Sequence, residues 1–398
     1  MKYLLIIFFL YVFLNFCFAQ EIIYGSITHD QIQRDYILYV PDNYTGNTPV
    51  PLILNFHGIG RSANHQMQYC DFRTIADSAG FLIVHPQGTL FNGMTHWNIG
   101  GFTVGSNTDD LGFTEALIDS LSAEYNVDPT MVYSAGYSNG GGMSFLLACQ
   151  LSERIAAIAS VSATMTPEIY NNSNPQHPTP ILQMHGTVDN VWPYNGTPWA
   201  ESVDDVIQYW VGYNNCNPTP SITVLPDIDP NDGSTVELFV YDDGDNNVSV
   251  LHYKIIGGGH TWPGNTGGGT NRDIDASEEI WNFFSRFDIN GLIIPVEIEN
   301  PIEIERIGFE LSGNYPNPFN PETTIYYSLK ENLQVTLNVY NIKGQLMKTL
   351  VNDIKPVGDH SVIWNGRDDK GKLVSGGIYF YKIKAGNGER IRKMILVK

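Results

Sequence analysis

The chain has little cysteine and little positive charge. Four cysteines occur in 398 residues, and 42 aspartates and glutamates outnumber 22 lysines and arginines, for a formal net charge of −20. A strongly acidic surface repels nucleic acid and anionic membrane surfaces, so neither is expected as a partner. The composition, 42% hydrophobic and 16% charged, excludes disorder of the whole chain and suits a globular protein with a sizeable core.

Long apolar runs are also missing, except at the N-terminus. Lys2 precedes an almost unbroken apolar stretch from Leu4 to Phe16, and Cys17-Phe18-Ala19 offers a cleavage site. This pattern predicts a signal peptide over residues 1–19. The run is short for a membrane anchor, so no stable membrane span is expected.

Removal of that segment leaves three cysteines, Cys70, Cys149 and Cys216. Three thiols in an exported protein allow one disulfide and one spare thiol, and the sequence does not select the pair. Cys149 follows an apolar helical run, which favours a buried free thiol.

Charge is distributed unevenly along the chain. Residues 20–308 hold 8 basic and 34 acidic side chains, whereas residues 309–398 hold 13 basic and 8 acidic ones. This difference indicates two domains with different surfaces. Residues 291–308, with Pro295, Pro301 and repeated Glu-Ile pairs, have the composition of an extended linker.

The first domain, residues 20–290, alternates short apolar runs with helical spacing. Strand-like runs include 52–56 and 131–134, and helical spacing occurs over 111–125 and 203–213. This alternation predicts an α/β fold with a doubly wound, mostly parallel sheet that helices cover on both faces.

The second domain, residues 309–398, has a period of two. Four alternating segments, 324–329, 334–340, 360–364 and 378–384, are separated by glycine-containing turns. The pattern predicts a small all-β sandwich.

A nucleophile motif follows the strand predicted over 131–134. The sequence Gly136-Tyr137-Ser138-Asn139-Gly140 has the G-x-S-x-G form and precedes a predicted helix. Its glycines permit a sharp strand-to-helix turn that exposes the serine hydroxyl. Ser138 is therefore the candidate nucleophile, and the amide of Asn139 is a candidate oxyanion donor at a helix N-terminus.

A second oxyanion donor is expected after the strand 52–56. His57-Gly58-Ile59-Gly60 occupies that position, and the amide of Ile59 is the candidate donor. The alternative is a glycine-rich loop without a catalytic role.

An acid is expected after the serine and before the base. Asp189 fits, because His185-Gly186-Thr187-Val188-Asp189 follows a short apolar strand. Asp204 and Asp205 are rivals, although an acidic pair at the start of a helix usually interacts with the helix dipole.

The candidate base is His260, in a glycine-rich loop after a strand that ends at Ile256. His185 and His252 compete with it. His185 is expected to serve structure and His252 to lie packed within a strand. The resulting chain order of serine, aspartate and histidine is that of the α/β-hydrolases.

Several tryptophans lie near these loops in the sequence. Trp97, Trp192 and Trp262 are the candidate substrate-binding residues, with Trp262 first because it is two residues from His260. Trp199 lies in the same region, and ordinary packing is an equal alternative for all four.

No metal or cofactor is expected. Asp227, Asp229, Asn231 and Gly233 resemble a calcium loop, but the twelfth position is Leu238 rather than glutamate, so an acidic turn is the preferred interpretation.

The motifs together carry a family resemblance. Residues 24–287 resemble the extracellular polyhydroxybutyrate depolymerase-like and feruloyl esterase group of α/β-hydrolases. The resemblance rests on five segments, which are His57-Gly58-Ile59-Gly60-Arg61-Ser62-Ala63, Pro86-Gln87-Gly88, Gly136-Tyr137-Ser138-Asn139-Gly140-Gly141, His185-Gly186-Thr187-Val188-Asp189 and Gly258-Gly259-His260-Thr261-Trp262-Pro263. It implies the same triad of Ser138, Asp189 and His260. Ile59 departs from the pattern, since relatives often carry cysteine there.

Residues 309–398 resemble a type IX secretion sorting domain. The matching segments are Asn314-Tyr315-Pro316-Asn317-Pro318-Phe319-Asn320-Pro321, Val339-Tyr340-Asn341-Ile342-Lys343-Gly344-Gln345 and Ser375-Gly376-Gly377-Ile378-Tyr379. The resemblance implies export through the periplasm by the type IX machinery, and a secreted or cell-surface location.

Three functions remain open at this point. The first is a serine esterase acting on feruloyl or acetyl esters of plant polysaccharide. The second is an extracellular polyester depolymerase, and the third is a non-catalytic surface binding protein, against which the intact triad argues.

Overall fold

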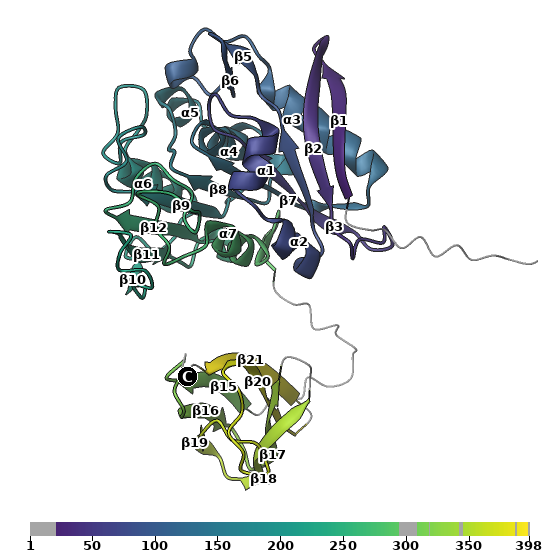
Figure 1. The fold of residues 1–398 in the computed structure, drawn as a ribbon, viewed down its shortest axis with the longest axis vertical. Helices are drawn as coiled ribbons and strands as arrows, with labels where there is room; N and C mark the ends of the chain where they lie inside the picture. The colour runs from purple at the N-terminus through teal and green to yellow at the C-terminus, as the bar shows by residue number, and fades with distance from the viewer. Residues whose placement is uncertain (1–20, 294–308, 318, 342–344, 387, 397–398) are drawn as a thin grey trace, which may run out of the picture. The chain divides into compact units, whose positions relative to one another are not determined.

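The computed structural model describes residues 21–293, 309–317, 319–341, 345–386 and 388–396. The chain divides into two compact units, Met1–Pro295 and Val296–Lys398 (Figure 1). The signal peptide predicted over residues 1–19 and most of the linker predicted over 291–308 lie outside the described residues.

The larger unit is built on one ten-stranded sheet with the order β1-β2-β4-β3-β7-β8-β9-β12-β11-β10. Its strands are β1 (Glu21–His29), β2 (Ile32–Val40), β3 (Val50–Phe56), β4 (Leu82–Pro86), β7 (Val127–Tyr137), β8 (Ala157–Val161), β9 (Ile181–Gly186), β10 (Ser221–Val224), β11 (Thr235–Tyr241) and β12 (Val250–Ile256). The six from β4 to β12 are parallel, and the outer strands are antiparallel. The sheet is therefore mixed, with the predicted parallel part at its centre.

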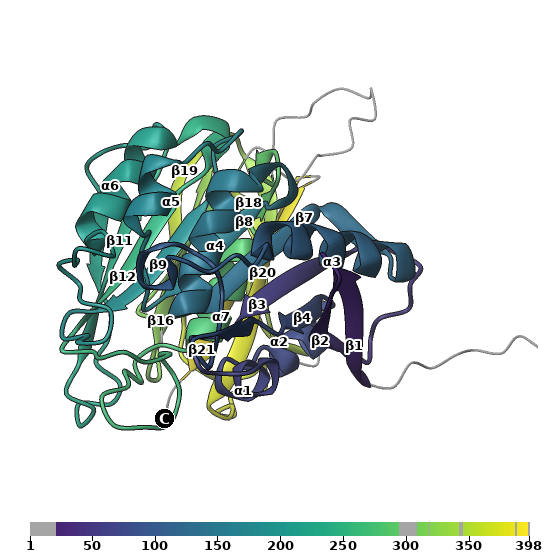
Figure 2. The same ribbon diagram turned by 90° about the horizontal axis from the view of Figure 1, so that it is seen from above.

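Helices cover both faces of this sheet (Figure 2). They are α1 (Ala63–Tyr69), α2 (Arg73–Ala79), α3 (Asp110–Glu124), α4 (Asn139–Gln150), α5 (Pro167–Asn171), α6 (Val203–Tyr213) and α7 (Ala276–Phe284). Side chains of α3, α4 and α6 form one buried apolar cluster with the sheet, and those of α2 and α7 form a second. Two separate clusters on one sheet are what a doubly covered α/β sheet requires.

Shorter elements complete the larger unit. The hairpin β5 (Thr89–Phe91) and β6 (Met94–His96) follows β4, and β13 (Phe287–Asp288) pairs with β14 (Gly291–Leu292) after α7. Single 3₁₀ turns lie at Gly101–Thr103, Ser152–Arg154 and Asp245–Asn247.

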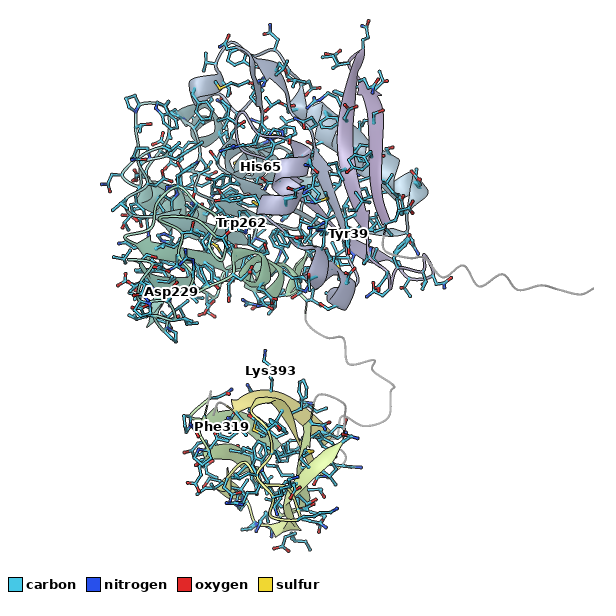
Figure 3. The ribbon with its side chains drawn as sticks, viewed as in Figure 1. Tyr39, His65, Asp229, Trp262, Phe319 and Lys393 are labelled. Atoms are coloured by element: carbon cyan, nitrogen blue, oxygen red, sulfur yellow. The ribbon has the colours of Figure 1, made fainter. Side chains whose placement is uncertain are left out.

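The smaller unit is all β and consists of two sheets with a common apolar core. A three-stranded sheet holds β15 (Phe309–Tyr315), β16 (Thr323–Leu329) and β19 (Gly358–Trp364). A four-stranded sheet holds β17 (Leu333–Asn341), β18 (Leu346–Lys355), β20 (Gly377–Ala385) and β21 (Gly388–Leu396). Trp364 is buried in this core, and so is Phe319. Figure 3 labels Phe319 within the smaller unit.

The three cysteines of the described residues are buried and unpaired. A disulfide among Cys70, Cys149 and Cys216, which the sequence allowed, is therefore not formed, and Cys149 is a buried free thiol as expected. Among the described residues no helix is long and apolar enough to cross a membrane.

Candidate active site

Ser138 lies in a sharp turn between β7 and α4. Its backbone has φ 56° and ψ −124°, a conformation that is costly for a residue with a side chain. A Cβ on Gly136 would lie 2.1 Å from the carbonyl oxygen of Gly140, and a Cβ on Gly140 would lie 2.1 Å from that of Phe56. Both glycines of the motif are therefore required by close backbone approach, as the sequence indicated.

The three predicted triad residues form one hydrogen-bonded chain. Nε2 of His260 lies 2.9 Å from Oγ of Ser138, and Nδ1 of His260 lies 2.7 Å from Oδ2 of Asp189. Ser138 and Asp189 are 6% and 4% exposed. All three triad residues lie in loops at the carboxyl ends of central parallel strands. Ser138 follows β7, Asp189 follows β9 and His260 follows β12.

The loop that carries Asp189 binds the Asp189 carboxylate oxygen that does not face His260. Its Oδ1 accepts hydrogen bonds from the amides of Val191 and Trp192, at 2.9 and 2.8 Å. Nε2 of His185 lies 3.5 Å from Oδ2, but it is hydrogen-bonded to the carbonyl of Trp192 at 2.7 Å. Burial lowers the pKa of His185, so this ring is neutral and supports the loop.

The loop that carries His260 is fixed by side chains that sequence reasoning did not single out. The hydroxyl of Tyr137 donates to the carbonyl of His260 at 2.7 Å, and that of Ser162 donates to the carbonyl of Thr261 at 3.1 Å. Tyr137 is part of the nucleophile motif itself, but its contact is 123 residues distant in the chain. No local pattern reveals such a bond.

The loop after β3 lies against the nucleophile. A Cβ on Gly58 would be 3.3 Å from Cβ of Ser138. The Gly58 carbonyl accepts from Nδ1 of His57 at 2.8 Å and from the amide of Arg61 at 3.1 Å. Since the N–H and C=O of one trans peptide point in opposite directions, the amide of Ile59 faces away from these partners.

His57 is a neutral ring with a defined tautomer. The amide of Gly88 donates to its Nε2 at 2.9 Å, so the proton is on Nδ1 and faces Gly58. Burial lowers the pKa of His57 to about 4. The ring thus orients the Gly58–Ile59 peptide without bringing charge to the site.

Asn139 joins the nucleophile turn to the segment that holds Trp97. Its Oδ1 accepts from the Trp97 amide at 2.7 Å, and its Nδ2 donates to the Trp97 carbonyl at 3.1 Å. The Asn139 side chain is fully buried. Among the described residues, no main-chain carbonyl outside α4 accepts the Asn139 amide itself.

The predicted substrate-binding tryptophans do not line an open cleft. Trp97, Trp192 and Trp262 are 0%, 2% and 2% exposed, and Trp262 lies within the larger unit (Figure 3). Their ring nitrogens donate to the carbonyl of His57 and to the hydroxyls of Thr164 and Ser277. Each ring fills the core and has an internal hydrogen-bond partner, which favours the alternative of ordinary packing.

The rival titratable residues occupy structural positions. Asp204 accepts from the hydroxyl of Tyr194 at 2.9 Å, and Asp205 accepts from Ser202, the N-cap of α6. His252 is buried in β12, where burial lowers its pKa to about 3. None of the three is hydrogen-bonded to Ser138.

Comparisons with known proteins agree with this architecture. Residues 46–203 match the phospholipase/carboxylesterase family, and residues 320–389 match the FlgD Ig-like domain. The larger unit has the α/β-hydrolase fold. The smaller all-β unit contains the Ig-like match.

Curated relatives of the chain carry names that include an esterase activity. The chain is 30% identical over 291 residues to a bifunctional acetylxylan esterase/xylanase of Neocallimastix patriciarum, which covers 73% of this chain and 37% of that protein. It is 30% identical over 243 residues to feruloyl esterase B of Piromyces equi, with 57% and 42% covered. It is 28% identical over 269 residues to feruloyl esterase D of Neurospora crassa, with 64% and 82% covered. The chain thus spans about two fifths of the length of the first two relatives.

Proposed function

We propose that the chain hydrolyses carboxylic esters through an acyl-enzyme intermediate. The observation that carries the proposal is the continuous chain from Oγ of Ser138 through His260 to Asp189, with contacts of 2.9 and 2.7 Å. In this proposal Ser138 is the nucleophile, His260 the general base and Asp189 the group that orients the base.

The proposed reaction has two halves. Oγ of Ser138 attacks the ester carbonyl carbon while Nε2 of His260 takes its proton. The C–O bond to the alcohol then breaks, and His260 returns the proton to the departing alkoxide. Water, deprotonated by the same histidine, attacks the acyl-serine and releases the acid.

The negative charge that develops on the carbonyl oxygen requires donors. We assign the main-chain amides of Ile59 and Asn139 to this role. Support comes from the orientation of the Gly58–Ile59 peptide by His57 and from the place of Asn139 as the first residue of α4. Loss of one such donor typically costs about 10²–10³ in kcat.

The proposed substrates are feruloyl or acetyl esters of plant polysaccharide. Support comes from the relatives, which are named as acetylxylan and feruloyl esterases. The acidic hydrolase-fold unit suits a neutral polymer better than an anionic one. Because Trp97, Trp192 and Trp262 are buried, the proposal assigns ferulate recognition to other groups.

A hydrolysis panel tests this function. The parent and Ser138→Ala are compared on methyl ferulate, acetylated xylan and a hydroxybutyrate polymer film. Release of ferulate or acetate by the parent alone supports the proposal. Clearing of the film without release from the other two indicates the polyester depolymerase, and no turnover of any substrate indicates a binding protein.

Secretion is part of the same proposal. Residues 1–19 would direct export, and residues 309–398 would engage the type IX secretion machinery for release or surface attachment. Support comes from the apolar run Leu4–Phe16 and from the matching segments in the smaller unit. A chain ending at residue 290 should accumulate in the periplasm, and its appearance in the medium at the parental level would overturn this role.

A further inference from the structure

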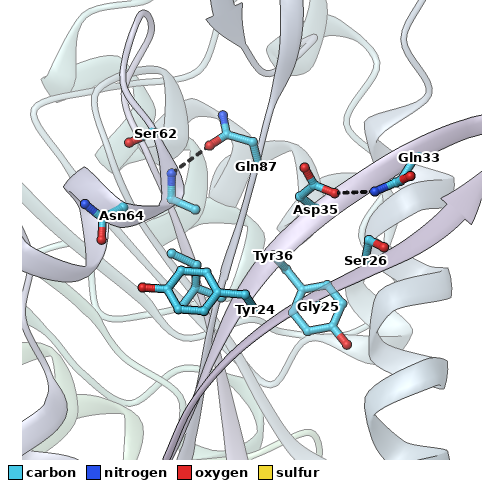
Figure 4. A pocket seen from close by; sticks show the side chains of 11 residues that line it. Tyr24, Gly25, Ser26, Gln33, Asp35, Tyr36, Ser62, Asn64 and Gln87 are labelled. Atoms are coloured by element: carbon cyan, nitrogen blue, oxygen red, sulfur yellow. Dashed lines mark hydrogen bonds between the residues drawn. The ribbon is translucent and has the colours of Figure 1, made fainter.

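A pocket of about 380 Å³ lies at the β1 edge of the large sheet, beside the N-terminus of α1 (Figure 4). Tyr24 and Asn64 line it from opposite elements, and Asp35, Gln33 and Gln87 contribute polar groups. No lysine or arginine is among its lining residues. The pocket shares none of its residues with the triad.

The pairing of β1 with β2 produces this surface. Tyr24 is directly opposite Ile37, and Ser26 is directly opposite Asp35, so all four side chains share one face of the two strands. On this face, the Ile37 side chain packs against Ala63 of α1. The apolar contact fixes α1 beside the strands and leaves the polar side chains above it open to solvent.

Tyr24 is an exposed aromatic ring among hydrogen-bonding groups. It is 73% exposed, the largest value among the exposed large hydrophobic side chains of the described residues. Nε2 of Gln33 donates to Oδ1 of Asp35 at 3.0 Å, which orients this carboxylate in the lining of the pocket (Figure 4). Asn64 lies on the other side of the ring and carries an exposed amide.

This combination suits a neutral sugar. A flat aromatic ring can pack against the apolar face of a pyranose, while carboxylate and amide groups exchange hydrogen bonds with its hydroxyls. An anionic ligand is disfavoured, because the lining residues include the Asp35 carboxylate and no lysine or arginine.

Shared residues and hydrogen bonds link the pocket to the loop after β3. A second pocket, lined by Gly60, Arg61, His65 and Met94 among others, shares Ser62 with it and begins one residue after Ile59. Gln87 joins the two regions, since its Oε1 accepts from the amide of Ala63 at 2.9 Å and its Nε2 lies 3.2 Å from Nε2 of His57.

The distance between Tyr24 and Ser138 suits a polymeric substrate rather than a small ester. In the sheet order, β1, which carries Tyr24, is four strands from β7, which leads into Ser138. With neighbouring strands about 4.8 Å apart, this is a span of about 19 Å. A small aryl or acetyl ester at Ser138 does not reach Tyr24, whereas several linked sugars do.

We infer that the Tyr24 pocket binds the backbone of a neutral polysaccharide whose ester group is presented to Ser138. The inference rests on the proposed esterase function for the identity of the chemistry at Ser138. The binding itself depends on Tyr24, Asp35 and Asn64 and is measurable without turnover.

Binding is tested first in the full chain with Ser138→Ala, which removes hydrolysis. Affinity electrophoresis in gels containing deacetylated xylan compares this protein with versions that also carry Tyr24→Ala, Tyr24→Phe or Asn64→Ala. Loss of the ring should weaken association roughly two- to tenfold, and Tyr24→Phe should retain most of it. Tyr326→Ala, which removes a 45% exposed tyrosine from the smaller unit, is the matched control.

Kinetics provide the second arm. The ratio of kcat/KM on acetylated xylan to kcat/KM on p-nitrophenyl acetate should fall roughly two- to tenfold in Tyr24→Ala and stay at the parental value in Tyr326→Ala. Thermal unfolding identifies any variant that does not fold, in which case Asn64→Ala carries the test.

The outcomes separate the two proposals. Equal retardation of Tyr24→Ala, Asn64→Ala and Tyr326→Ala would overturn the polysaccharide site, even if the parent hydrolyses esters. If the parent protein hydrolyses no ester but Tyr24→Ala and Asn64→Ala still reduce retardation, the esterase function is overturned and the polysaccharide site is retained.

Discussion

Asp189 and His260 are joined by a single carboxylate oxygen, because the other oxygen of Asp189 is held by two main-chain amides. Oδ2 lies 2.7 Å from Nδ1 of His260, and Oδ1 accepts from Val191 and Trp192. The carboxylate therefore cannot rotate freely, and the His260 proton is kept on Nδ1. Nε2 is left free to accept the proton of Ser138.

Asp189→Asn should lower kcat by about 10⁴. The asparagine oxygen can keep the two main-chain bonds, so its NH₂ group would face His260 and place the ring proton on Nε2, where it cannot accept from Ser138. Steady-state kinetics on a short-chain ester measure the effect. Asp204→Asn, a carboxylate at the start of α6, is the control, and a comparable loss in it would contradict the assignment.

Asn139→Ala should destabilise the hydrolase-fold unit by about 1–3 kcal/mol. The substitution leaves the buried amide and carbonyl of Trp97 without their partners at 2.7 and 3.1 Å. The main-chain amide of residue 139 remains, so kcat should fall far less than in Ser138→Ala. Denaturant unfolding and kinetics at 25 °C together check this. Unchanged stability would show that the Trp97 link contributes nothing.

Trp262→Ala should be a stability variant rather than a specificity variant. The ring is 2% exposed, packs edge-on against Phe72 and donates to Ser277. Its removal should cost about 3–5 kcal/mol of unfolding free energy. The ratio of kcat/KM on methyl ferulate to that on p-nitrophenyl acetate should not change. A selective loss on ferulate would mean that the indole contacts substrate after all.

Stability of the hydrolase-fold unit should decrease on mild acidification. Burial lowers the pKa of His57 to about 4 and those of His85 and His252 to about 3. In the unfolded chain the pKa of each of these rings is about 6.5. Below that pH the unfolded chain binds protons that the folded chain does not, so each histidine lowers the unfolding free energy by up to about 1.4 kcal/mol per pH unit.

Thermal unfolding between pH 7.5 and pH 5 measures this slope. Tm should fall as the pH is lowered, and His85→Leu should flatten this dependence because one of the buried histidines is removed. A Tm independent of pH over this range would contradict the burial argument.

Local sequence was sufficient for the residues that close backbone geometry demands. The G-x-S-x-G turn, the Asp189 loop after β9 and the glycine-rich loop before His260 each follow a short apolar strand, and parallel strands bring their carboxyl ends to one edge. The strands β3 and β7 and the helices α3 and α6 were predicted within a few residues for the same reason, since their periodicity is local.

Features that depend on distant contacts were not predictable. The exposure of Trp97, Trp192 and Trp262 is set by whatever packs around them, and an indole near a catalytic loop in sequence carries no sign of its burial. The outer strands β1, β10 and β11 were not predicted, because their sequence patterns are short or weakly alternating. The bond from Tyr137 to the His260 carbonyl spans 123 residues and has no sequence signal.

The most direct test of the account is the activity of Ser138→Ala on a short-chain ester such as p-nitrophenyl acetate. The substituted protein should keep the parental Tm within a few degrees, and its kcat should be roughly 10⁶ lower, because the triad acts as a unit. Activity within tenfold of the parent, in a folded protein, would contradict the assignment of Ser138 as the nucleophile.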